Sequence, residues 1–419
     1  MLQLLILTDD FTGALDTGVQ FVKFGAKTCV TTDPKISFDE TEAKVLVIDT
    51  ETRHIAPEKA FYILREIGQR AAAAGIAQIY KKTDSALRGN IGAELDGLMA
   101  GTGIDRLAYI PAFPKLGRYT KDGVLYIDNK PVNESVFGKD LFEPVTESYI
   151  PKVIQGQCSR PVRLNKSGEM AVAPSGITVF DARTDEELCA AADALKQTTQ
   201  PILLAGCAGF AEFWAKTMRL QRADCQTFVY DRKVLILAGS LNPITLRQSR
   251  MVKLHNVPAM LLDQKYTVQV MEDMDQAANS ILEQMDKHSR LILETVDSDL
   301  PLKKEENGAV CRDKSINISG IISANLGRLA LSLAEKGFRG TLVVTGGDTL
   351  KGVVSEACSF EITLMEEIEP GVILSHLKLD GYELTVVSKS GGMGSEKVFL
   401  NVFDYVNQCA LRELGCVKV

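Results

Sequence analysis

LQLLILTDDFTGALDTGVQFVKF, residues 2–24, holds the pattern that decides the fold. Residues 2–7 form a short and almost continuous apolar run, which predicts a buried strand. Apolar residues then return near helical spacing over residues 12–24, which predicts an amphipathic helix. A buried strand that leads into such a helix is the repeating unit of α/β proteins with parallel sheets.

The same alternation continues along most of the chain. Further strands are predicted at 26–31, 44–48, 78–82, 107–110, 177–180 and 202–204, with helices at 57–74, 90–100 and 186–196. Between residues 111 and about 174 Pro and Gly become frequent, which is typical of functional loops or of a small β excursion. A second set of strands is predicted at 234–238, 259–262, 291–294, 341–345 and 384–387.

A polar and mixed stretch at 221–233 separates the two sets and predicts a domain boundary. The predicted fold class is therefore α/β with two domains, 1–228 and 229–419. Each is expected to be a mainly parallel sheet flanked by helices, with a cleft between them. A charged stretch at 298–315 is predicted to be an exposed loop.

Composition excludes several classes of protein. The net charge of -7 argues against nucleic acid as the main partner, because a phosphate backbone demands a basic surface. Nine scattered cysteines and only four histidines, without a CxxC pair, make a zinc site improbable and favour reduced thiols. The N-terminus lacks a basic leader region and no apolar run is long enough to span a bilayer. We therefore expect a cytoplasmic protein without a membrane partner.

Two adjacent carboxylates, Asp9 and Asp10, follow the first strand directly. Ligands of open α/β sheets bind at the carboxyl ends of the strands, so these side chains are candidates for function. They could accept a hydrogen bond from a substrate hydroxyl or hold Mg²⁺ through water. The alternative is that Asp10 or Thr12 only caps the following helix.

A second polar loop, KKTDSALRGN at 81–90, also follows a strand and precedes a helix. Its Lys and Arg side chains could hold a carboxylate, and Asp84 could be a base or a metal ligand. Asn90 could be the helix N-cap, and Glu94 a first-turn charge. Arg53, in the loop 50–54, would suit an anionic substrate, although a polar loop of this kind is a weak signal alone.

Two other features lie at strand ends. The segment 111–120 could be a lid or a wall of the pocket, or equally a rigid structural loop. In the second half, glycine-rich turns follow strands at 237–240, 345–349 and 388–395. Glycines permit close backbone approach and helix N-termini bind anions, so three such turns together suggest a phosphate or nucleotide site. A P-loop, a GxGxxG fingerprint and a GxSxG elbow are all missing from the sequence.

Taken in order along the chain, the motifs resemble the four-carbon acid sugar kinase family. They are TDDFTGALDTGVQF (8–21), KTDSALRGNIGAELDGL (82–98), PAFPKLGRYTKDGVLYI (111–127), AGSLNPIT (238–245), VVTGGDTL (343–350), PGV (370–372) and SKSGGMG (388–394). The resemblance implies a sugar-acid-binding domain at 1–228 and a nucleotide-binding domain at 229–419. It implies transfer of the γ-phosphate of ATP to the terminal hydroxyl of threonate, erythronate or a 3-oxo-tetronate, with Mg²⁺ expected.

The resemblance and the loop chemistry together give the expected site residues. The substrate-binding residues are Asp9, Asp10, Arg53, Lys82, Thr83, Asp84, Ser85 and Arg88. The ATP-binding residues are Ser240, Gly346, Gly347, Asp348, Thr349, Gly391 and Gly392. Asp84 and Asp9 compete as the catalytic base, and the metal ligands are not assigned.

Two other functions stay open at this point. The chain could be a kinase for another small hydroxy-acid or sugar, or a non-catalytic protein that binds a nucleotide or metabolite. The density of acidic and basic groups in the loops 8–12 and 82–90 argues against the second, because a sensor needs no proton acceptor. Assembly into a homo-oligomer is also left open.

Overall fold

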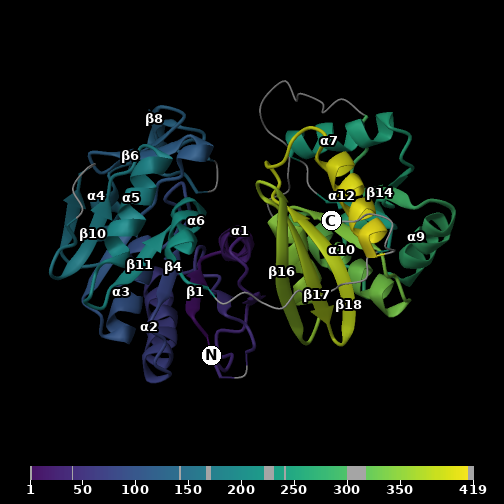
Figure 1. The fold of residues 1–419 in the computed structure, drawn as a ribbon. Coiled ribbons are helices and arrows are strands. Elements are labelled where there is room, and N and C mark those ends of the chain that lie inside the picture. The colour runs from purple at the N-terminus through teal and green to yellow at the C-terminus, as the bar shows by residue number, and fades with distance from the viewer. Residues whose placement is uncertain are drawn as a thin grey trace. The chain divides into compact units, whose positions relative to one another are not determined.

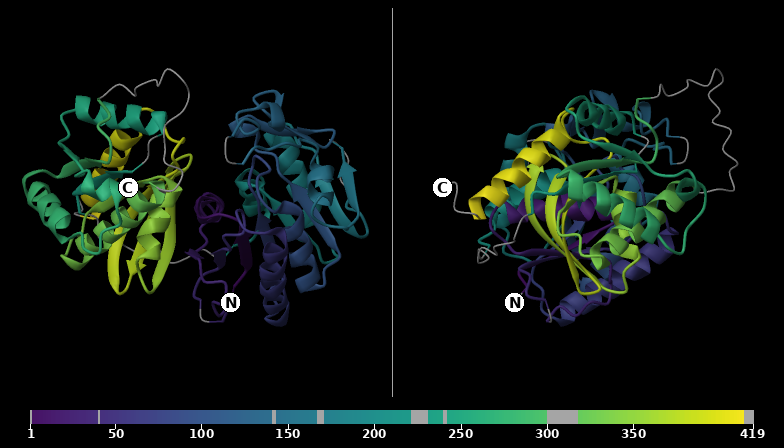
Figure 2. Two further views of the ribbon diagram at one scale, coloured as in Figure 1. Left: turned by 180° about the vertical axis from the view of Figure 1, so that it is seen from behind. Right: turned by 90° about the vertical axis from the view of Figure 1, so that its right-hand side faces the viewer.

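A computed structural model describes residues 2–39, 41–140, 143–166, 171–220, 231–239, 242–299 and 318–413 (Figure 1). The chain divides into two compact units, Met1–Asp224 and Cys225–Val419. The predicted boundary at 228/229 lies within 221–230, outside the described residues. Two further views of both units are given in Figure 2.

In the described part of the first unit, the main sheet is parallel throughout. Its order is β2 (Thr28–Thr31), β3 (Val45–Asp49), β1 (Leu4–Thr8), β4 (Ile79–Lys82), β11 (Leu203–Gly206), β5 (Arg106–Ile110), β10 (Gly176–Phe180), β9 (Val162–Asn165). From β1 the chain moves to β2 and β3 on one side and then crosses to β4 on the other. This reversal creates the kind of switch point where open sheets bind ligands.

Helices cover both faces of this sheet because the crossovers run in opposite directions. Right-handed connections place α1 (Phe11–Val22), α5 (Asp185–Lys196) and α6 (Ala208–Thr217) together, and α1 and α5 each pack against α6. On the other face α2 (Pro57–Ala73) packs against α3 (Ile91–Thr102), and α3 against α4 (Ile150–Gln155). Apart from the edge strand β9, the strands between them are almost fully buried, which explains their largely apolar runs.

The Pro- and Gly-rich segment at 111–174 does contain a small β excursion. Three short antiparallel strands, β6 (Arg118–Lys121), β7 (Val124–Ile127) and β8 (Lys130–Pro131), form a separate sheet. Two short 3₁₀ turns, η1 (Pro114–Leu116) and η2 (Val132–Glu134), flank them. The helix α4 and the edge strand β9 also fall in this segment, and the sequence pattern did not predict them.

The second unit has its own mainly parallel sheet. The order of its described strands is β13 (Ala259–Leu261), β14 (Arg290–Glu294), β12 (Val234–Ala238), β15 (Thr341–Thr345), β18 (Tyr382–Lys389), β17 (Val372–Leu379), β16 (Phe360–Glu369). The first five run parallel to one another. Strand β17 is antiparallel to β18, and β16 is antiparallel to β17. The α/β class with mainly parallel sheets is confirmed, while β16 and β17 were missed.

The described helices of this unit are α7 (Pro243–Leu254), α8 (Lys265–Val268), α9 (Asp275–Lys287), α10 (Ile318–Glu335), α11 (Gly347–Ser355) and α12 (Val398–Glu413). Helix α7 packs against α12, and α10 packs against α8, α9 and α11. Most of the predicted exposed loop at 298–315 lies in 300–317, outside the described residues. Among the helices that can be described in either unit, none has the length and apolar character that a membrane crossing requires.

Candidate active site

The first polar loop follows β1 and gives its two aspartates different surroundings. The Asp10 Oδ1 atom accepts a hydrogen bond from the Gly13 backbone N–H at 3.1 Å and so caps α1. Asp10 keeps 26% of its side chain exposed, whereas Asp9 is 2% exposed. The capping interpretation therefore holds for Asp10 and not for Thr12. Capping uses one lone pair and leaves Asp10 able to face cations as well.

Arg53 and Lys82 meet both aspartates at the ends of three adjacent strands, β3, β1 and β4. The Arg53 Nε donates to Asp9 Oδ2 at 2.8 Å, and Arg53 Nη2 lies 2.8 Å from Asp10 Oδ1. Lys82 Nζ lies 3.0 Å from Asp10 Oδ1 and 3.5 Å from Asp9 Oδ1. Gly13 makes this approach feasible, because a Cβ atom there would stand 1.9 Å from Lys82 Nζ.

Asp84 joins the same group from the loop after β4. Arg88 donates to both of its carboxylate oxygens at 2.9 Å, the bidentate arrangement that arginine favours. The backbone N–H groups of Ala86 and Arg88 also donate to Asp84 Oδ2, and Arg53 Nη2 lies 3.6 Å from Oδ1. Asp84 is thus fixed in place by nearly all the donors that its two oxygens can accept.

We call these six side chains the charge cluster: Asp9, Asp10, Arg53, Lys82, Asp84 and Arg88. The structure brings together six of the eight expected substrate residues. The other two point to different partners. The Thr83 hydroxyl lies 3.0 Å from the Tyr109 hydroxyl, and the Ser85 hydroxyl accepts a hydrogen bond from Arg118 Nη1.

Electrostatics keep the buried carboxylates of this cluster ionised. Burial opposes ionisation of Asp9, but the neighbouring charges of Lys82 and Arg53 outweigh it and hold its pKa below the ordinary value. Burial likewise opposes ionisation of Asp84. The hydrogen bonds from Arg88 and the nearby Arg53 charge hold the pKa of Asp84 well below its usual range. An anion that enters this site therefore meets formed ion pairs rather than bare cations.

A second ion pair lies beneath the cluster. Lys81 Nζ is 3.0 Å from Glu94 Oε2, the Thr52 hydroxyl donates to Glu94 Oε1, and both charged side chains are at most 1% exposed. Glu94 does lie in the first turn of α3, as expected, and there it is a buried partner of Lys81. Asn90 does precede α3, but its amide donates to the Thr52 and Ile55 carbonyl oxygens instead of capping the helix.

No sequence pattern singled out Asp49, the last residue of β3. Its carboxyl group is buried, accepts a hydrogen bond from the Glu51 N–H, and has an Oδ2 atom without a partner among the described residues. Burial and the nearby charges of Asp10, Glu51 and Asp9 raise the pKa of Asp49 to about 7. The predicted strand ended at residue 48, so Asp49 looked like an ordinary polar residue after a strand, whereas it is the last residue of β3.

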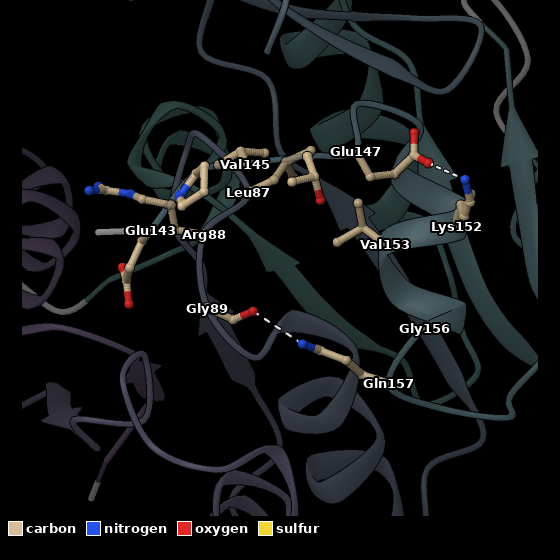
Figure 3. Close-up of a pocket in the computed structure, with 12 residues that line it drawn as sticks. Leu87, Arg88, Gly89, Glu143, Val145, Glu147, Lys152, Val153, Gly156 and Gln157 are labelled. Atoms are coloured by element: carbon tan, nitrogen blue, oxygen red, sulfur yellow. Dashed lines mark hydrogen bonds and ion pairs between the residues drawn. The ribbon is translucent and has the colours of Figure 1, made fainter. Parts of the chain in front are cut away.

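A cavity of about 590 Å³ lies beside the loop that carries Arg88 (Figure 3). Leu87, Arg88 and Gly89 line it together with residues 143–147, Lys152, Val153, Gly156 and Gln157. In Figure 3 the Arg88 side chain extends away from Glu147 and Lys152, which pair at 2.6 Å. The Gln157 amide donates to the Gly89 carbonyl oxygen at 3.3 Å and so steadies the loop from this side.

In the second unit, the three glycine-rich turns follow β12, β15 and β18, which are neighbours in the sheet. The Gly346 N–H donates to the Lys389 carbonyl oxygen at 2.8 Å, and the Thr245 hydroxyl donates to the Gly391 carbonyl oxygen at 3.0 Å. A Cβ atom on Gly239 would lie 3.0 Å from the Thr349 hydroxyl. The turns therefore converge. Expected residue Ser240 lies outside the described residues.

Side chains hold the carbonyl groups of the turn after β18. Lys389, 1% exposed, donates through Nζ to the carbonyl oxygens of Ser390, Gly391 and Met393, and Gln248 donates to those of residues 393–395. Among described residues, the N–H groups of Gly391, Gly392 and Gly394 donate no hydrogen bond. Burial without a carboxylate lowers the pKa of Lys389 to about 8. Unused N–H groups of this kind are the donors that bind anions in glycine-rich turns.

Gly346, Gly347, Asp348 and Thr349 form the start of α11. Gly346 has φ +95°, a left-handed conformation that favours glycine. Thr349 is buried and Asp348 is exposed beside a cavity of about 420 Å³ between α10 and α11. No group of three metal-ligating side chains gathers anywhere in the described parts of the chain.

Two family models match this chain, one within each of its two compact units. A family model described as a sugar-binding N-terminal domain matches residues 4–214, and one described as a nucleotide-binding C-terminal domain matches 235–399. The chain is 28% identical to a D-threonate kinase of Salmonella typhimurium strain LT2, over 97% of this chain and 99% of the relative. It is 25% identical to a D-erythronate kinase of Heliobacterium modesticaldum, over 97% of each.

A crystal structure of a protein from Salmonella typhimurium LT2, named as a putative tRNA synthase, shares the fold with a TM-score of 0.79. The identity is 22%, over 96% of this chain and 98% of the other. Fold, charge cluster and kinase relatives together define a two-domain α/β phosphotransferase, which confirms the expected enzyme class. The chain belongs to the four-carbon acid sugar kinase family.

Proposed function

We propose that this enzyme transfers the γ-phosphoryl group of ATP to the C4 hydroxyl of a four-carbon sugar acid. The observation that carries the proposal is the charge cluster at the ends of β1, β3 and β4. Phosphoryl transfer needs mainly positioning and charge stabilisation, and a rigid set of buried ion pairs supplies both to a small polar substrate. The kinase relatives support threonate, erythronate and 3-oxo-tetronates as the substrates to test.

Of the two candidate bases, Asp9 suits proton acceptance better than Asp84. Both oxygens of Asp84 are engaged by the Arg88 fork, and two backbone N–H groups add to one of them. On Asp9, Oδ2 accepts a hydrogen bond from Arg53, whereas Oδ1 is approached by Lys82 Nζ only at a long 3.5 Å. A base needs a lone pair aimed at the hydroxyl it deprotonates. We assign Asp9 as the proton acceptor and Asp84 as the residue that positions Arg88.

The nucleotide phosphates would bind in the second unit. The N–H groups of Gly391 and Gly392 and the start of α11 at Gly347 offer backbone donors there. The family model described as nucleotide-binding covers all of these residues. Ser240, Gly346, Asp348 and Thr349 belong to the same proposed site.

Mg²⁺ could bind in the second unit with one carboxylate from the protein. In kinases the ion is usually held by phosphate oxygens, water and one or two carboxylates, so a three-ligand protein cage is not required. Asp348, exposed in the first turn of α11, can supply such a carboxylate. The bound ion would neutralise charge on the phosphates.

The test is an ADP-coupled assay with ATP and Mg²⁺ over D- and L-threonate, D- and L-erythronate and their 3-oxo forms. We expect saturable ADP release with at least one tetronate, and D-threonate is the first to test because its kinase is 28% identical. Turnover only with other hydroxy-acids or sugars would replace the substrate class. Binding of ATP and a tetronate without any ADP release would contradict the proposal.

A further inference from the structure

We propose that Arg118, at the start of β6, binds the carboxylate of the sugar acid. This inference rests on the proposed function and adds a residue that the sequence motifs left without a role. Arg118 enters from the small antiparallel sheet and not from the loops after β1, β3 and β4. It reaches the loop after β4 by donating a hydrogen bond from Nη1 to the Ser85 hydroxyl.

The charge cluster alone has no cation to spare. It contains three carboxylates and three cations, and each cation lies within 3.0 Å of at least one of the carboxylates. Two more carboxyl groups, those of Asp49 and Glu51, lie near the cluster, although burial favours the protonated form of Asp49. A substrate carboxylate would therefore have to displace an existing ion pair if only Arg53, Lys82 or Arg88 were available.

Arg118 is different because its contacts are neutral. Its guanidinium lies 5.3 Å from the centre of the Phe137 ring, and its hydrogen-bond partner is a hydroxyl group. Among described residues, no carboxylate lies within ion-pair distance of Arg118, and its buried Nε has no hydrogen-bond partner. A buried N–H donor without a partner is costly unless a ligand satisfies it.

The same aromatic ring places Arg118 beside the cluster. The Arg88 guanidinium lies 5.4 Å from the centre of the Phe137 ring, so both arginines stack against one side chain. Arg88 is already bound to Asp84 through two hydrogen bonds. Stacking on Phe137 restricts the planar Arg118 group, and a fixed planar fork is the geometry that recognises a carboxylate. Of Arg53, Lys82, Arg88 and Arg118, only Arg118 has no carboxylate partner among the described residues, so its charge is left for a monoanionic substrate.

A neutral substrate analogue provides the test. Wild-type enzyme and Arg118→Met are compared with the best tetronate and with the matching tetritol, in which a CH₂OH group replaces the carboxylate. We expect the variant to raise KM for the tetronate about 10- to 100-fold, the range for a lost hydrogen bond to a charged group, while kcat changes much less. Its kcat/KM for the tetritol should stay within about twofold of wild type.

Arg70 gives a matched control in the same unit. Its guanidinium also lies over an aromatic ring, 5.0 Å from the centre of Phe38, and also donates to neutral groups, the Pro34 and Ile36 carbonyl oxygens. Arg70→Met removes a stacked arginine without touching the charge cluster. It should leave KM for the tetronate unchanged, and thermal unfolding of both variants shows whether they fold.

The outcomes separate this inference from the proposed function. If Arg118→Met lowers kcat/KM equally for the tetronate and the tetritol, or lowers it for neither, Arg118 does not bind the carboxylate. If the wild type turns over no tetronate, the proposed function fails, and tetronate binding is then measured by calorimetry. Tetronate binding that Arg118→Met weakens at least tenfold still supports the inference; binding that it leaves unchanged, or no binding to wild type, overturns it.

Discussion

The charge cluster of the first unit and the glycine-rich turns of the second occupy the same kind of place, the carboxyl ends of adjacent parallel strands. The first is made of ionised side chains that neutralise one another, such as Arg53 with Asp9. The second is made of backbone groups, with Lys389 and Gln248 holding the carbonyl oxygens. Under the proposed function, the first sheet edge would offer charge and shape to a sugar acid, and the second would offer N–H donors to phosphate.

This difference has an energetic consequence. Buried ion pairs are expensive to desolvate, and removal of one partner leaves an uncompensated charge. The backbone donors of the turn after β18 are half-buried or exposed, so they carry little desolvation cost, but their direction depends on backbone conformation. Single substitutions should therefore act on chemistry and stability in the first unit, and on backbone geometry in the second.

The largest effect is expected at the proposed base. Asp9→Asn should lower kcat about 100- to 10,000-fold, because the variant cannot accept the hydroxyl proton. Steady-state kinetics measure this, with Asp84→Asn as the comparison, which should act more on KM through loss of Arg88 positioning. A larger fall in kcat for Asp84→Asn than for Asp9→Asn would reverse the two roles.

The next effect concerns the ion pair beneath the cluster. Glu94→Gln should cost about 3 kcal/mol in the free energy of unfolding, because Lys81 stays buried without its counter-charge. Urea denaturation measures the loss. The double variant Lys81→Met/Glu94→Leu should recover most of it, since an apolar pair of similar volume can replace a buried ion pair. Equal instability of single and double variants would show that packing, not charge, is responsible.

A smaller effect is expected in the second unit. Gly346→Ala should raise KM for ATP about tenfold by forcing the turn out of its left-handed conformation, without changing KM for the sugar acid. Gly337 is the control, because its φ of +86° is also left-handed and a Cβ there meets nothing within 4 Å. Gly337→Ala should lower stability similarly and leave both KM values alone. An equal rise in KM for ATP in both variants would contradict the assignment.

The last effect depends on pH. The pKa of Asp49 is about 7 in the folded state, above its ordinary value, so the folded state holds a proton that the unfolded chain releases near pH 4. Wild-type stability should therefore fall as pH rises from about 4 to about 7 through this group.

Asp49→Asn should be more stable than wild type at pH 8 by about 1 kcal/mol or more, since a displacement of one pH unit in a pKa corresponds to ~1.4 kcal/mol. At pH 4.5 the two proteins should differ much less. Thermal unfolding at both pH values measures the difference, and a gap that does not depend on pH would remove the titration of Asp49 as its cause.

Local sequence patterns predicted the parallel strands well because these strands are buried on both faces and read as apolar runs. Strand β16 was missed because it is largely half-exposed and carries glutamates such as Glu366 and Glu367, which hide its period. Strand β17 was also missed, although it is almost fully buried. The polar loops were found from their place after strands. Their pairing was not, because Arg53 and Asp9 lie 44 residues apart.

Arg118 and Lys389 both show that local sequence patterns do not predict the contacts of a side chain. Among the described residues Arg118 has no carboxylate partner and its Nε has no hydrogen-bond partner, and no sequence pattern reports that. Lys389 ends a strand and looks like a solvent-facing charge, yet it is buried against carbonyl oxygens. In both cases the deciding neighbours come from the tertiary fold.

The turn after β18, with its carbonyl groups held by side chains and its glycine N–H groups left unused among the described residues, also affects how the enzyme can evolve. Every residue except proline supplies a peptide N–H, and no single-base change turns a glycine codon into a proline codon, so no such change deletes the donors of Gly391 and Gly392 directly. Each side chain of the charge cluster can be lost in a single mutation. Drift within a lineage should therefore alter which sugar acid is accepted sooner than it alters the use of a nucleoside triphosphate.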